Sequence, residues 1–594
     1  MKATIPAVVD VTQYGARPDS GEDATLAVFR ALQQCRGMEA AVLRFAPGRY
    51  DFWPELAYEK EVVISNHDND GRRKIAFPLI GMKQLSIEAP QAEFVFHGLI
   101  IPFLLENSSN IRLSGFSIDW EVPMMAQGSI TKVFEEGFEI RVDVGYAYEL
   151  ADGKLSFQGE GWSREVWGLI EYDPATQATA YGSADQWSWG HYKELQVTEP
   201  EPGVLRFSGN RTRRKPILGN KLIFRFGRRD HPAIVVSGCT DTVIEEVTVR
   251  HALGMGVIAQ NSRDTRLNRF HVTGREDTER VFTTMADATH FVYCTGLIEL
   301  KDCLLEHQMD DPCNVHGIYG RIARRVAPDT LLVQLMNRQQ KGVNIASPGE
   351  RMSFVSGQSL LTYGAAELTS VHPINMDYML LTFKDELPET LQPGDAVENI
   401  SRTASVVIQG CTVRRNRARG FLITAAGEVL LEGNTISSPG AGVKISGDAN
   451  FWFESGGTQS IVIRGNTFLD CNYAYPSWGK AVIDIDPEIQ DPESAVGYYH
   501  GRIRIEDNVF RTYDKPLVKG HSVAQLAFTG NRIERSGTYP PHGGAEYVLE
   551  LKACGTVELE GNVAIEDKAA SLLIAGRPIS WKVEERLVVE ANHN

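Results

Sequence analysis

A six-residue phrase recurs through the last third of the chain and limits the folds that this chain can adopt. Its frame is an apolar residue, a polar residue, Gly or Asp, Asn or Cys, any residue, and usually a second apolar residue. The fourth position falls on Cys411, Asn434, Asn466, Asn508, Asn531 and Asn562, so the successive gaps are 23, 32, 42, 23 and 31 residues. The shortest gap of 23 residues predicts a stacked coil of that length, and the longer gaps predict loops between coils.

Each phrase leads a strand of β-branched or aromatic residues into a Gly-Asn or Asp-Asn pair, where positive φ is tolerated and the chain can turn a corner. Looser copies lie at residues 113–118, 244–249, 267–272 and 300–305. The 594 residues also exceed the roughly 250 to 300 that one compact core holds. We therefore predict an all-β fold, a right-handed parallel β-helix that runs through much of the chain.

Two stretches interrupt the repeat. Residues 123–228 and 319–399 lose the corner phrase and show the alternating polar and apolar pattern of hairpins. We predict two small inserted antiparallel β modules that resemble barrels, a type of insertion that often carries recognition surfaces on solenoids. The remaining parts are then an N-terminal cap with the first coils (1–122), central coils (229–318) and C-terminal coils (400–594). Residues 23–35 have helical apolar spacing, which suits a cap over the open end of the core.

Composition excludes several classes of partner. Lys plus Arg number 60 against 76 for Asp plus Glu, giving a net charge of −16, and no basic run stands out, so nucleic acid is not expected as a partner. The longest apolar stretch, residues 99–105, falls short of the ~20 residues that span a bilayer. The eight cysteines are scattered without CxxC spacing, as expected of buried free thiols.

The densest polar cluster lies at residues 279–316. Asp287 precedes Asp310 by 23 residues, the shortest coil spacing, so these two side chains and Asp311 are expected to converge on neighbouring coils. Adjacent aspartates on a regular strand point to opposite faces. Either the chain therefore bulges before Pro312, or one aspartate of the pair is catalytic and the other structural. Crowded carboxyls raise one another's pKa, and glycoside hydrolysis needs one protonated and one ionised carboxyl.

Other readings of the same residues stay open. An Asp-Asp-Pro turn exposed to solvent would explain the pair without any chemistry. Zinc is a competing hypothesis for Cys303, His307, Cys313 and His316, although four ligands from one strand and turn would have to converge tetrahedrally. Calcium held by the three aspartates is another.

Aromatic residues are numerous enough to bind sugars by stacking on the C–H face of a pyranose. The candidates are Trp452 with its neighbours Phe451 and Phe453, Trp478 near Tyr473 and Tyr475, and the pair Trp187 and Trp189. Packing in the core is the alternative for each of them.

Several segments together resemble glycoside hydrolase family 110. They are residues 10–16, 47–50 (Pro-Gly-Arg-Tyr), 116–120 (Phe-Ser-Ile-Asp-Trp), 286–291 (Ala-Asp-Ala-Thr-His-Phe) and 309–312 (Met-Asp-Asp-Pro) with the following His316-Gly317. The resemblance covers nearly the whole chain and both predicted insertions. It implies a bacterial exo-acting α-1,3-galactosidase that inverts configuration, removes terminal galactose from glycans such as the blood group B antigen, and uses no metal or other cofactor in its chemistry.

For the site, we assign Asp287 as the general acid and Asp310 or Asp311 as the base that polarises water. His290, Asn314, His316 and Trp452 are predicted to bind the substrate, α-galactosyl glycans on oligosaccharides, glycoproteins or glycolipids. A glycan target argues for export to the periplasm or the exterior, although residues 1–10 show no signal peptide. The sequence leaves the oligomeric state open, with a homodimer as one option, and does not decide between linear and branched substrates.

Two alternatives from other classes remain. A polygalacturonase-like pectinase would carry Asn-Thr-Asp and Arg-Ile-Lys motifs, whereas this chain has Ala-Asp-Ala at 286–288 and Val-Lys-Ile at 443–445. A non-catalytic glycan-binding β-helix would need aromatic clefts but no convergent carboxyls.

Overall fold

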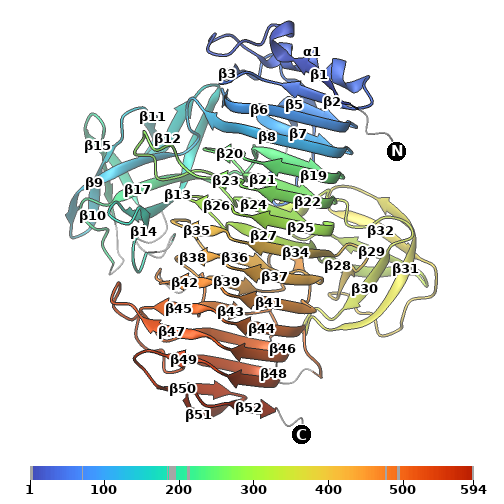
Figure 1. Cartoon of the computed structure of the whole chain (residues 1–594), viewed down its shortest axis with the longest axis vertical. Coiled ribbons are helices and arrows are strands. Elements are labelled where there is room, and N and C mark those ends of the chain that lie inside the picture. Colours follow the sequence, from blue (N-terminus) through green and yellow to red (C-terminus); the bar gives the residue numbers. More distant parts are fainter. Residues whose placement is uncertain are drawn as a thin grey trace.

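The computed structural model describes residues 5–590 except 70, 184, 186–194, 210–213, 475–477, 491 and 493–495. The chain forms a right-handed parallel β-helix, a single tall stack of coils with two modules on opposite flanks (Figure 1). The predicted fold class, including the two insertions, is confirmed. No helix among the described residues has both the length and the apolar character needed to cross a membrane.

The N-terminal end of the stack is capped by a short βαβ unit. Helix α1 (Thr25–Arg36) buries its apolar face, including Val28, Leu32 and Cys35, against the first coils. Strand β1 (Ala7–Asp10) pairs in parallel with β2 (Ala41–Arg44) beside it. The helix lies across the end of the stack in Figure 1, so it covers apolar side chains that would otherwise face water.

Three parallel sheets form the faces of the coils, and parallel pairing from coil to coil defines each one. The sheet that bears the site, here called the site sheet, contains β5 (Arg72–Ile80), β7 (Ile101–Glu106), β18 (Ile234–Ser237), β21 (Val257–Gln260), β24 (Thr289–Val292), β27 (Cys313–Ile318), β36 (Phe421–Ile423), β39 (Val443–Ile445), β43 (Ile483–Ile485), β46 (Val518–Thr529), β48 (Leu549–Glu560) and β50 (Ala569–Ile574).

The second sheet contains β6 (Lys83–Phe96), β8 (Ser109–Trp120), β19 (Thr240–Glu245), β22 (Arg263–Asn268), β25 (Thr295–Lys301), β34 (Ala404–Gln409), β37 (Glu428–Glu432), β41 (Ser460–Arg464) and β44 (His500–Glu506). The third contains β3 (Gly48–Phe52), β20 (Thr248–Val249), β23 (His271–Val272), β26 (Leu304–Glu306), β35 (Thr412–Arg414), β38 (Thr435–Ile436), β42 (Thr467–Leu469), β45 (Val509–Thr512), β47 (Arg532–Arg535) and β49 (Val563–Ala564). Because β6, β8, β46 and β48 are long, they bend through a corner and contribute to two sheets.

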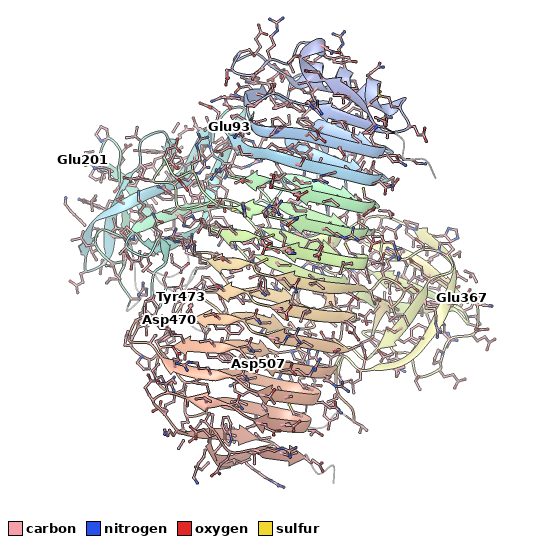
Figure 2. All side chains as sticks on the ribbon, in the orientation of Figure 1. Glu93, Glu201, Glu367, Asp470, Tyr473 and Asp507 are labelled. Atoms are coloured by element: carbon pink, nitrogen blue, oxygen red, sulfur yellow. The ribbon has the colours of Figure 1, made fainter. Side chains whose placement is uncertain are left out.

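The first inserted module is an antiparallel sheet between β8 and β18. Its strands are β9 (Ala126–Phe134), β10 (Gly137–Val142), β11 (Ala147–Ala151), β12 (Lys154–Gly159), β13 (Trp162–Asp173), β14 (Ala178–Thr179), β15 (Gln196–Glu201), β16 (Val204–Ser208) and β17 (Lys221–Phe226). The second module is a closed antiparallel barrel of β28 (Gly320–Ala327), β29 (Thr330–Gln334), β30 (Arg351–Val355), β31 (Thr362–Pro373), β32 (Tyr378–Phe383) and β33 (Ala396–Asn399). Glu201 and Glu367 mark the two modules on opposite sides of the stack in Figure 2.

Short pairings complete the described strands. Strand β4 (Tyr58–Glu61) pairs antiparallel with β5, and β40 (Glu454–Ser455) pairs antiparallel with β27. At the C-terminal end, β51 (Arg577–Lys582) and β52 (Leu587–Glu590) pair antiparallel with β50 and β48. These last strands fold back over the open edge of the stack.

The recurring phrase forms one corner of each coil. The Gly or Asp at its third position takes positive φ, as in Gly433 (65°) and Asp507 (54°). The next residue points inward, and the asparagine side chains bond neighbouring coils to one another. The Oδ1 atom of Asn508 accepts from the backbone N–H of Asn466 at 2.9 Å, and its Nδ2 atom donates to the carbonyl of Ile463 at 2.9 Å. This asparagine ladder satisfies buried polar groups along the corner.

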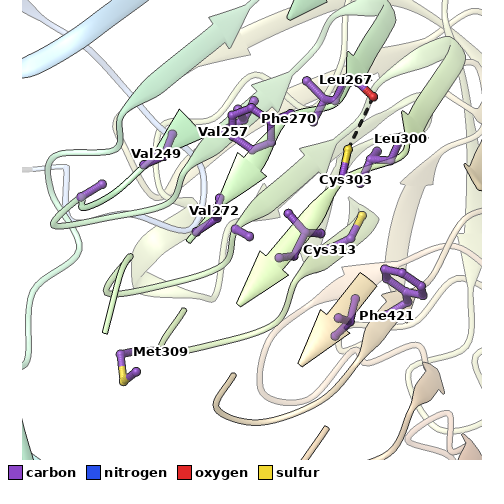
Figure 3. Close-up of a cluster of buried hydrophobic side chains, with 14 of the residues drawn as sticks. Val249, Val257, Leu267, Phe270, Val272, Leu300, Cys303, Met309, Cys313 and Phe421 are labelled. Carbon is purple, nitrogen blue, oxygen red and sulfur yellow. Dashed lines mark hydrogen bonds between the residues drawn. The ribbon is translucent and has the colours of Figure 1, made fainter. Parts of the chain in front are cut away.

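The interior of the stack is apolar from end to end. Figure 3 shows its centre, where Val257, Phe270 and Leu300 face one another across the sheets. Cys303 sits at the corner position of its coil and is buried, with its Sγ atom 3.7 Å from the carbonyl of Leu267. The described cysteines are free and buried, and burial raises the pKa of the Cys313 thiol to about 12.

Candidate active site

A cleft of about 460 Å³ lies on the outer face of the site sheet, and the three predicted aspartates lie in it. A larger cavity of about 710 Å³ lies where the first module meets β8. The carboxylates that line that cavity are paired with cations, for example Asp119 with Arg280 at 3.0 Å and Asp143 with Lys221 at 2.9 Å. The smaller cleft brings together three buried carboxyls, and it is therefore the candidate site.

Two successive coils position the carboxyls. Asp287 lies just before β24, and Asp310 and Asp311 lie just before β27. The register pairs Thr289 with Cys313, an offset of 24 residues, and the N–H of Ala288 donates to the carbonyl of Asp311 at 2.9 Å. The direct partner of Asp287 on the next coil is therefore Asp311. The spacing of 23 residues had predicted Asp310, which was wrong by one position because this coil is one residue longer than the shortest repeat.

The three side chains do converge. One oxygen of each carboxyl lies within 4.8 Å of the others. All three are buried, with exposed fractions of 3% for Asp287, 8% for Asp310 and 1% for Asp311. Asp310 is therefore the most accessible of the three to a molecule in the cleft.

Asp287 belongs to a chain of hydrogen bonds that includes His290, which also lines the cleft, and His316. Its Oδ2 atom lies 2.6 Å from Nδ1 of His290, and Nε2 of His290 lies 2.8 Å from Nε2 of His316. Nδ1 of His316 lies 2.6 Å from the carbonyl oxygen of Gly317. That oxygen can only accept, so Nδ1 of His316 carries the hydrogen. With both imidazoles neutral, the chain is complete only when Asp287 carries a proton.

The electrostatics of Asp287 agree with that hydrogen-bond pattern. Burial, together with the nearby Asp310 carboxylate, raises the pKa of Asp287 to about 8. Burial and the neighbouring His316 hold the pKa of His290 well below its usual range, so that ring is neutral. Asp287 is thus protonated at neutral pH, as a general acid must be.

Asp310 has the opposite character. Its Oδ2 atom accepts from Nη2 of Arg229, and its Oδ1 atom accepts from Nη1 of Arg417 at 3.1 Å. Burial alone would raise the pKa of Asp310, but Arg417 and Arg229, with further contributions from Arg419 and Arg225, outweigh it and hold that pKa well below its usual range. This carboxyl is ionised.

Asp311 is bound by Arg419 through both oxygens. Oδ1 accepts from the backbone N–H of Arg419 at 3.0 Å and from its Nε at 3.1 Å, and Oδ2 accepts from Nη2 at 2.8 Å. Burial and the two neighbouring aspartates raise the pKa of Asp311 to about 7, against the effect of Arg419. A carboxylate has about four acceptor sites, so a water molecule can still donate to Asp311.

The same three oxygens are the ligand type that Ca²⁺ prefers. However, guanidinium groups of Arg229, Arg417 and Arg419 already bind two of the three carboxyls and supply the compensating charge. The proposed zinc ligands do not come together among the described residues. His307, for example, contacts the carbonyl of Gln177, and Cys303 packs in the core corner.

The walls of the cleft contain the predicted Asn314 and Trp452. Asn314 is buried, and its Oδ1 atom has no hydrogen-bond partner in the described structure. Trp452 is 40% exposed and lines the cleft with Trp167 and Trp478. Trp478 stacks against the Arg417 guanidinium at 5.1 Å. The candidates Trp187, Trp189 and Tyr475 lie outside the described residues.

A loop of an early coil closes the cleft at the side nearer the N-terminus. The N–H of Asn66 donates to the carbonyl of Gln339 in the second module at 2.7 Å. The N–H of Asp68 donates to the carbonyl of Arg229 at 2.7 Å, and the Asp68 carboxylate pairs with Arg338. Asn66 itself lines the cleft. This wall joins the first coils, the second module and an arginine that binds Asp310.

The sequence predicted the carboxyls but missed the arginines that set their charges. Arg417 and Arg419 lie in the arginine-rich run 414–419, one coil after Asp310, but the 81-residue second module separates the two in sequence. Arg229 lies just after the first module. The run of four arginines was the available signal, and it becomes informative once coil stacking places it beside the aspartates.

Comparison with known proteins places the chain in a family. The regions described as GLAA-B beta-barrel domain I and II match residues 126–222 and 330–397, and a right handed beta helix region matches 396–579. Alpha-1,3-galactosidase B of Bacteroides thetaiotaomicron is 32% identical over 93% of this chain and 90% of its own length. Alpha-1,3-galactosidase A of Shewanella woodyi is 34% identical over the same shares, and alpha-1,3-galactosidase A of Bacteroides fragilis is 32% identical over 93% and 92%. The chain therefore belongs to the α-1,3-galactosidase family, glycoside hydrolase family 110.

Proposed function

We propose that this protein is an exo-glycosidase that hydrolyses terminal α-1,3-linked galactose, with the blood group B antigen and linear α-1,3-galactosides as substrates. One observation carries the chemical part of the proposal: a buried cluster of three carboxyls in which Asp287 holds a proton and Asp310 is ionised. Glycoside hydrolysis needs both states within one site. The names of the relatives support the linkage and the sugar.

The wall formed by residues 64–68 and Arg229 supports the exo mode. A cleft closed at one side accepts the end of a chain, and the terminal galactose would occupy the space between that wall and the aspartates. Asn314, whose Oδ1 atom lacks a partner, would accept from a galactose hydroxyl. Trp452 would offer its exposed ring to an apolar sugar face.

We assign to Asp287 the transfer of its proton from the hydrogen bond with His290 to the leaving glycosidic oxygen, and to Asp310 or Asp311 the activation of water. The two nitrogens of His290 and those of His316 are already engaged with Asp287, each other and Gly317. We therefore assign these histidines to positioning Asp287 and its proton, in place of the hydroxyl recognition that the sequence had suggested.

Inversion of configuration is part of the proposal. The 4.8 Å limit on the oxygen separations is below the ~6.5 to 9.5 Å typical of inverting carboxyl pairs, so distance does not support it. Support comes from the family resemblance and from the arginines. Because guanidinium groups bind both oxygens of Asp310 and of Asp311, these carboxylates are weak nucleophiles but can still accept a hydrogen from water.

A pectinase function has less support from the cleft. A uronate substrate would need a cation free to bind its carboxylate. Lys444, the lysine of the segment compared with the pectinase Arg-Ile-Lys motif, is paired with Asp484 and Asp486 at 3.0 Å each. Of the arginines that line the cleft, Arg229, Arg417 and Arg419 are paired with the site aspartates and Arg225 with Asp185.

Proton NMR of galactose release tests linkage and stereochemistry together. We expect β-galactose as the first anomer released from a linear α-1,3-galactose disaccharide and from the branched blood group B trisaccharide. First appearance of α-galactose would contradict inversion. Absence of galactose from both substrates would overturn the proposed activity.

The order of roles among the aspartates has its own test. In Asp287→Asn, hydrolysis of an aryl galactoside with an activated leaving group should survive far better than hydrolysis of the disaccharide, because an activated leaving group needs no protonation. Asp310→Asn and Asp311→Asn are the matched variants. If Asp310→Asn instead spares the activated substrate, the proton donor is Asp310, the most exposed of the three.

A further inference from the structure

The outer face of the site sheet is apolar on the coils before the aspartates and charged on the coils after them. Strand pairing places one outward-facing residue of each coil in a single row: Leu104, Val235, Ile258, His290, Asn314, Leu422, Lys444, Asp484, Lys519 and Glu550. The first three pack under residues 62–64 and the second module in a buried apolar cluster. After the site, the row becomes charged. The N-terminal side of the cleft is therefore covered, and the row of Lys444, Asp484, Lys519 and Glu550, here called the polar row, leads away from it on the other side.

The polar row connects the catalytic cleft to a second cavity. Lys444 lines the cleft, whereas Asp484, Lys519 and Glu550 line a neighbouring cavity of about 300 Å³. Asp486 lines both. Coils stack at roughly 4.8 Å, so Asp484 lies three steps, roughly 14 Å, beyond Asn314. A sugar in the second cavity would therefore be joined to the galactose through at least one intervening sugar.

The charges of the polar row alternate and are internally paired. Lys444 Nζ lies 3.0 Å from Asp484 Oδ2, and Lys519 Nζ lies 2.8 Å from Glu550 Oε2. Hydroxyl groups both donate and accept, so they can bind such a row, whereas an anionic or cationic sugar would meet a like charge at every second position. The chemistry fits a neutral oligosaccharide.

Asp484, which lines the second cavity, has a buried carboxylate oxygen without a partner. Asp484 is 1% exposed, and its Oδ1 atom accepts no hydrogen bond from any described residue. A buried acceptor left without a donor costs free energy, so a ligand hydroxyl donated to this atom would be favourable.

We propose that the polar row binds the sugar chain on the leaving-group side of the scissile bond, so that the preferred substrate is a neutral oligosaccharide of several sugars that ends in α-1,3-galactose. The proposal rests on the proposed function, because it needs galactose in the catalytic cleft. It names a binding site several coils away from the aspartates and a substrate longer than a disaccharide.

The test measures kcat/KM for galactose release from a series of neutral chains with one to four sugars on the reducing side of the α-1,3-galactose. We expect the wild type to gain about tenfold between the shortest and longest chains, the effect of a few hydrogen bonds to charged groups. The double variant Lys519→Ala with Glu550→Ala should lose most of this gain. The matched double variant Lys582→Ala with Glu585→Ala removes an exposed ion pair of the same kind on β51 and the turn after it, outside both cavities, and should retain the gain.

A second measurement uses the same chains without galactose as competitive inhibitors. Their inhibition constants should fall with length for the wild type and stay flat for Lys519→Ala with Glu550→Ala. Equal kcat/KM for all lengths, or a length dependence kept by that variant, would overturn the polar row as a binding site while leaving the galactosidase activity standing. If no chain of any length releases galactose, the proposed function is wrong, and this proposal, which depends on it, is wrong as well.

Discussion

The corner ladder and the carboxyl cluster of Asp287, Asp310 and Asp311 use the same stacking of coils but treat polar side chains in opposite ways. In the ladder, asparagines such as Asn466 and Asn508 repeat from coil to coil, and each donor meets an acceptor. In the cluster, stacking brings Asp287 and Asp311 together, and burial, with the nearby Asp310 carboxylate, raises the pKa of both. Neutral amides stack favourably because they both donate and accept. Carboxyls stack only when protons or arginines compensate them.

Stability and reactivity are therefore separated by position around the coil. The ladder has its polar groups satisfied within the fold, whereas the cluster keeps a proton on one acid and arginines on the others. Each of the following substitutions acts mainly on the ladder or mainly on the carboxyl cluster.

The largest effect is expected for Asp310→Asn. We expect kcat to fall about 10³-fold or more, because the variant removes the charge that distinguishes Asp310 from Asp287. The circular dichroism spectrum should stay that of the wild type. Asp567→Asn, an exposed aspartate paired with Arg535, is the control and should keep full activity. Near wild-type turnover in Asp310→Asn would remove this residue from the mechanism.

Asn508→Ala should act on stability and leave the chemistry intact. It removes the acceptor of the Asn466 N–H and the donor to the Ile463 carbonyl, both buried, at a cost of about 2 to 4 kcal/mol. Urea unfolding measures the loss, with Gln525→Ala on an exposed position of β46 as the control. An unchanged unfolding midpoint would show that the ladder is not what stabilises the corner.

The smallest effect is expected in the pH dependence of stability. Folding raises the pKa of Asp287 from its usual acidic value to about 8, so the folded state binds this proton more tightly. The contribution to stability is full at low pH and is lost as pH rises toward 8. Asp287→Asn removes it, so the stability of this variant relative to wild type should grow by about 1 to 3 kcal/mol between pH 5 and pH 8.

Asp310→Asn gives the matched comparison with the opposite sign. The pKa of Asp310 is lowered on folding, so its ionised form stabilises the protein wherever pH is above the ordinary aspartate range. Thermal melts should show Asp310→Asn destabilised at both pH 5 and pH 8, and less strongly at pH 8, because the variant also removes the charge that raises the pKa of Asp287. A pH-independent difference for Asp287→Asn would contradict the protonated state assigned to that residue.

Much of the fold could be predicted because each coil of a solenoid repeats the same short sequence pattern. The spacing from Asn508 to Asn531 gives the coil length, and Gly or Asp before each asparagine marks the corner. The family resemblance, based on segments such as 286–291 and 309–312, is confirmed by relatives that match most of the chain. The convergence of the three aspartates followed from the same arithmetic, although the register was off by one residue.

The arginines could not be predicted from that arithmetic. The second module separates Arg417 from Asp310 in sequence and adds no coil, and Arg229 lies directly after the first module, several coils before Asp310. The same holds for Asn66 and Gln339, which meet only because the second module packs against a loop of the first coils. No periodicity connects residues across such insertions.

The sequence by itself determined the stack: coil length, corners, cap, two interruptions, and the coils that carry the carboxyls. These features depend on contacts between adjacent coils, and the spacing of the repeated phrase shows which residues make those contacts. Only the tertiary structure decided which aspartate keeps its proton, which side of the cleft is closed, and where the polar row leads. Those properties depend on burial and on charges brought together from distant segments, and the pKa of a buried group responds to all of them at once.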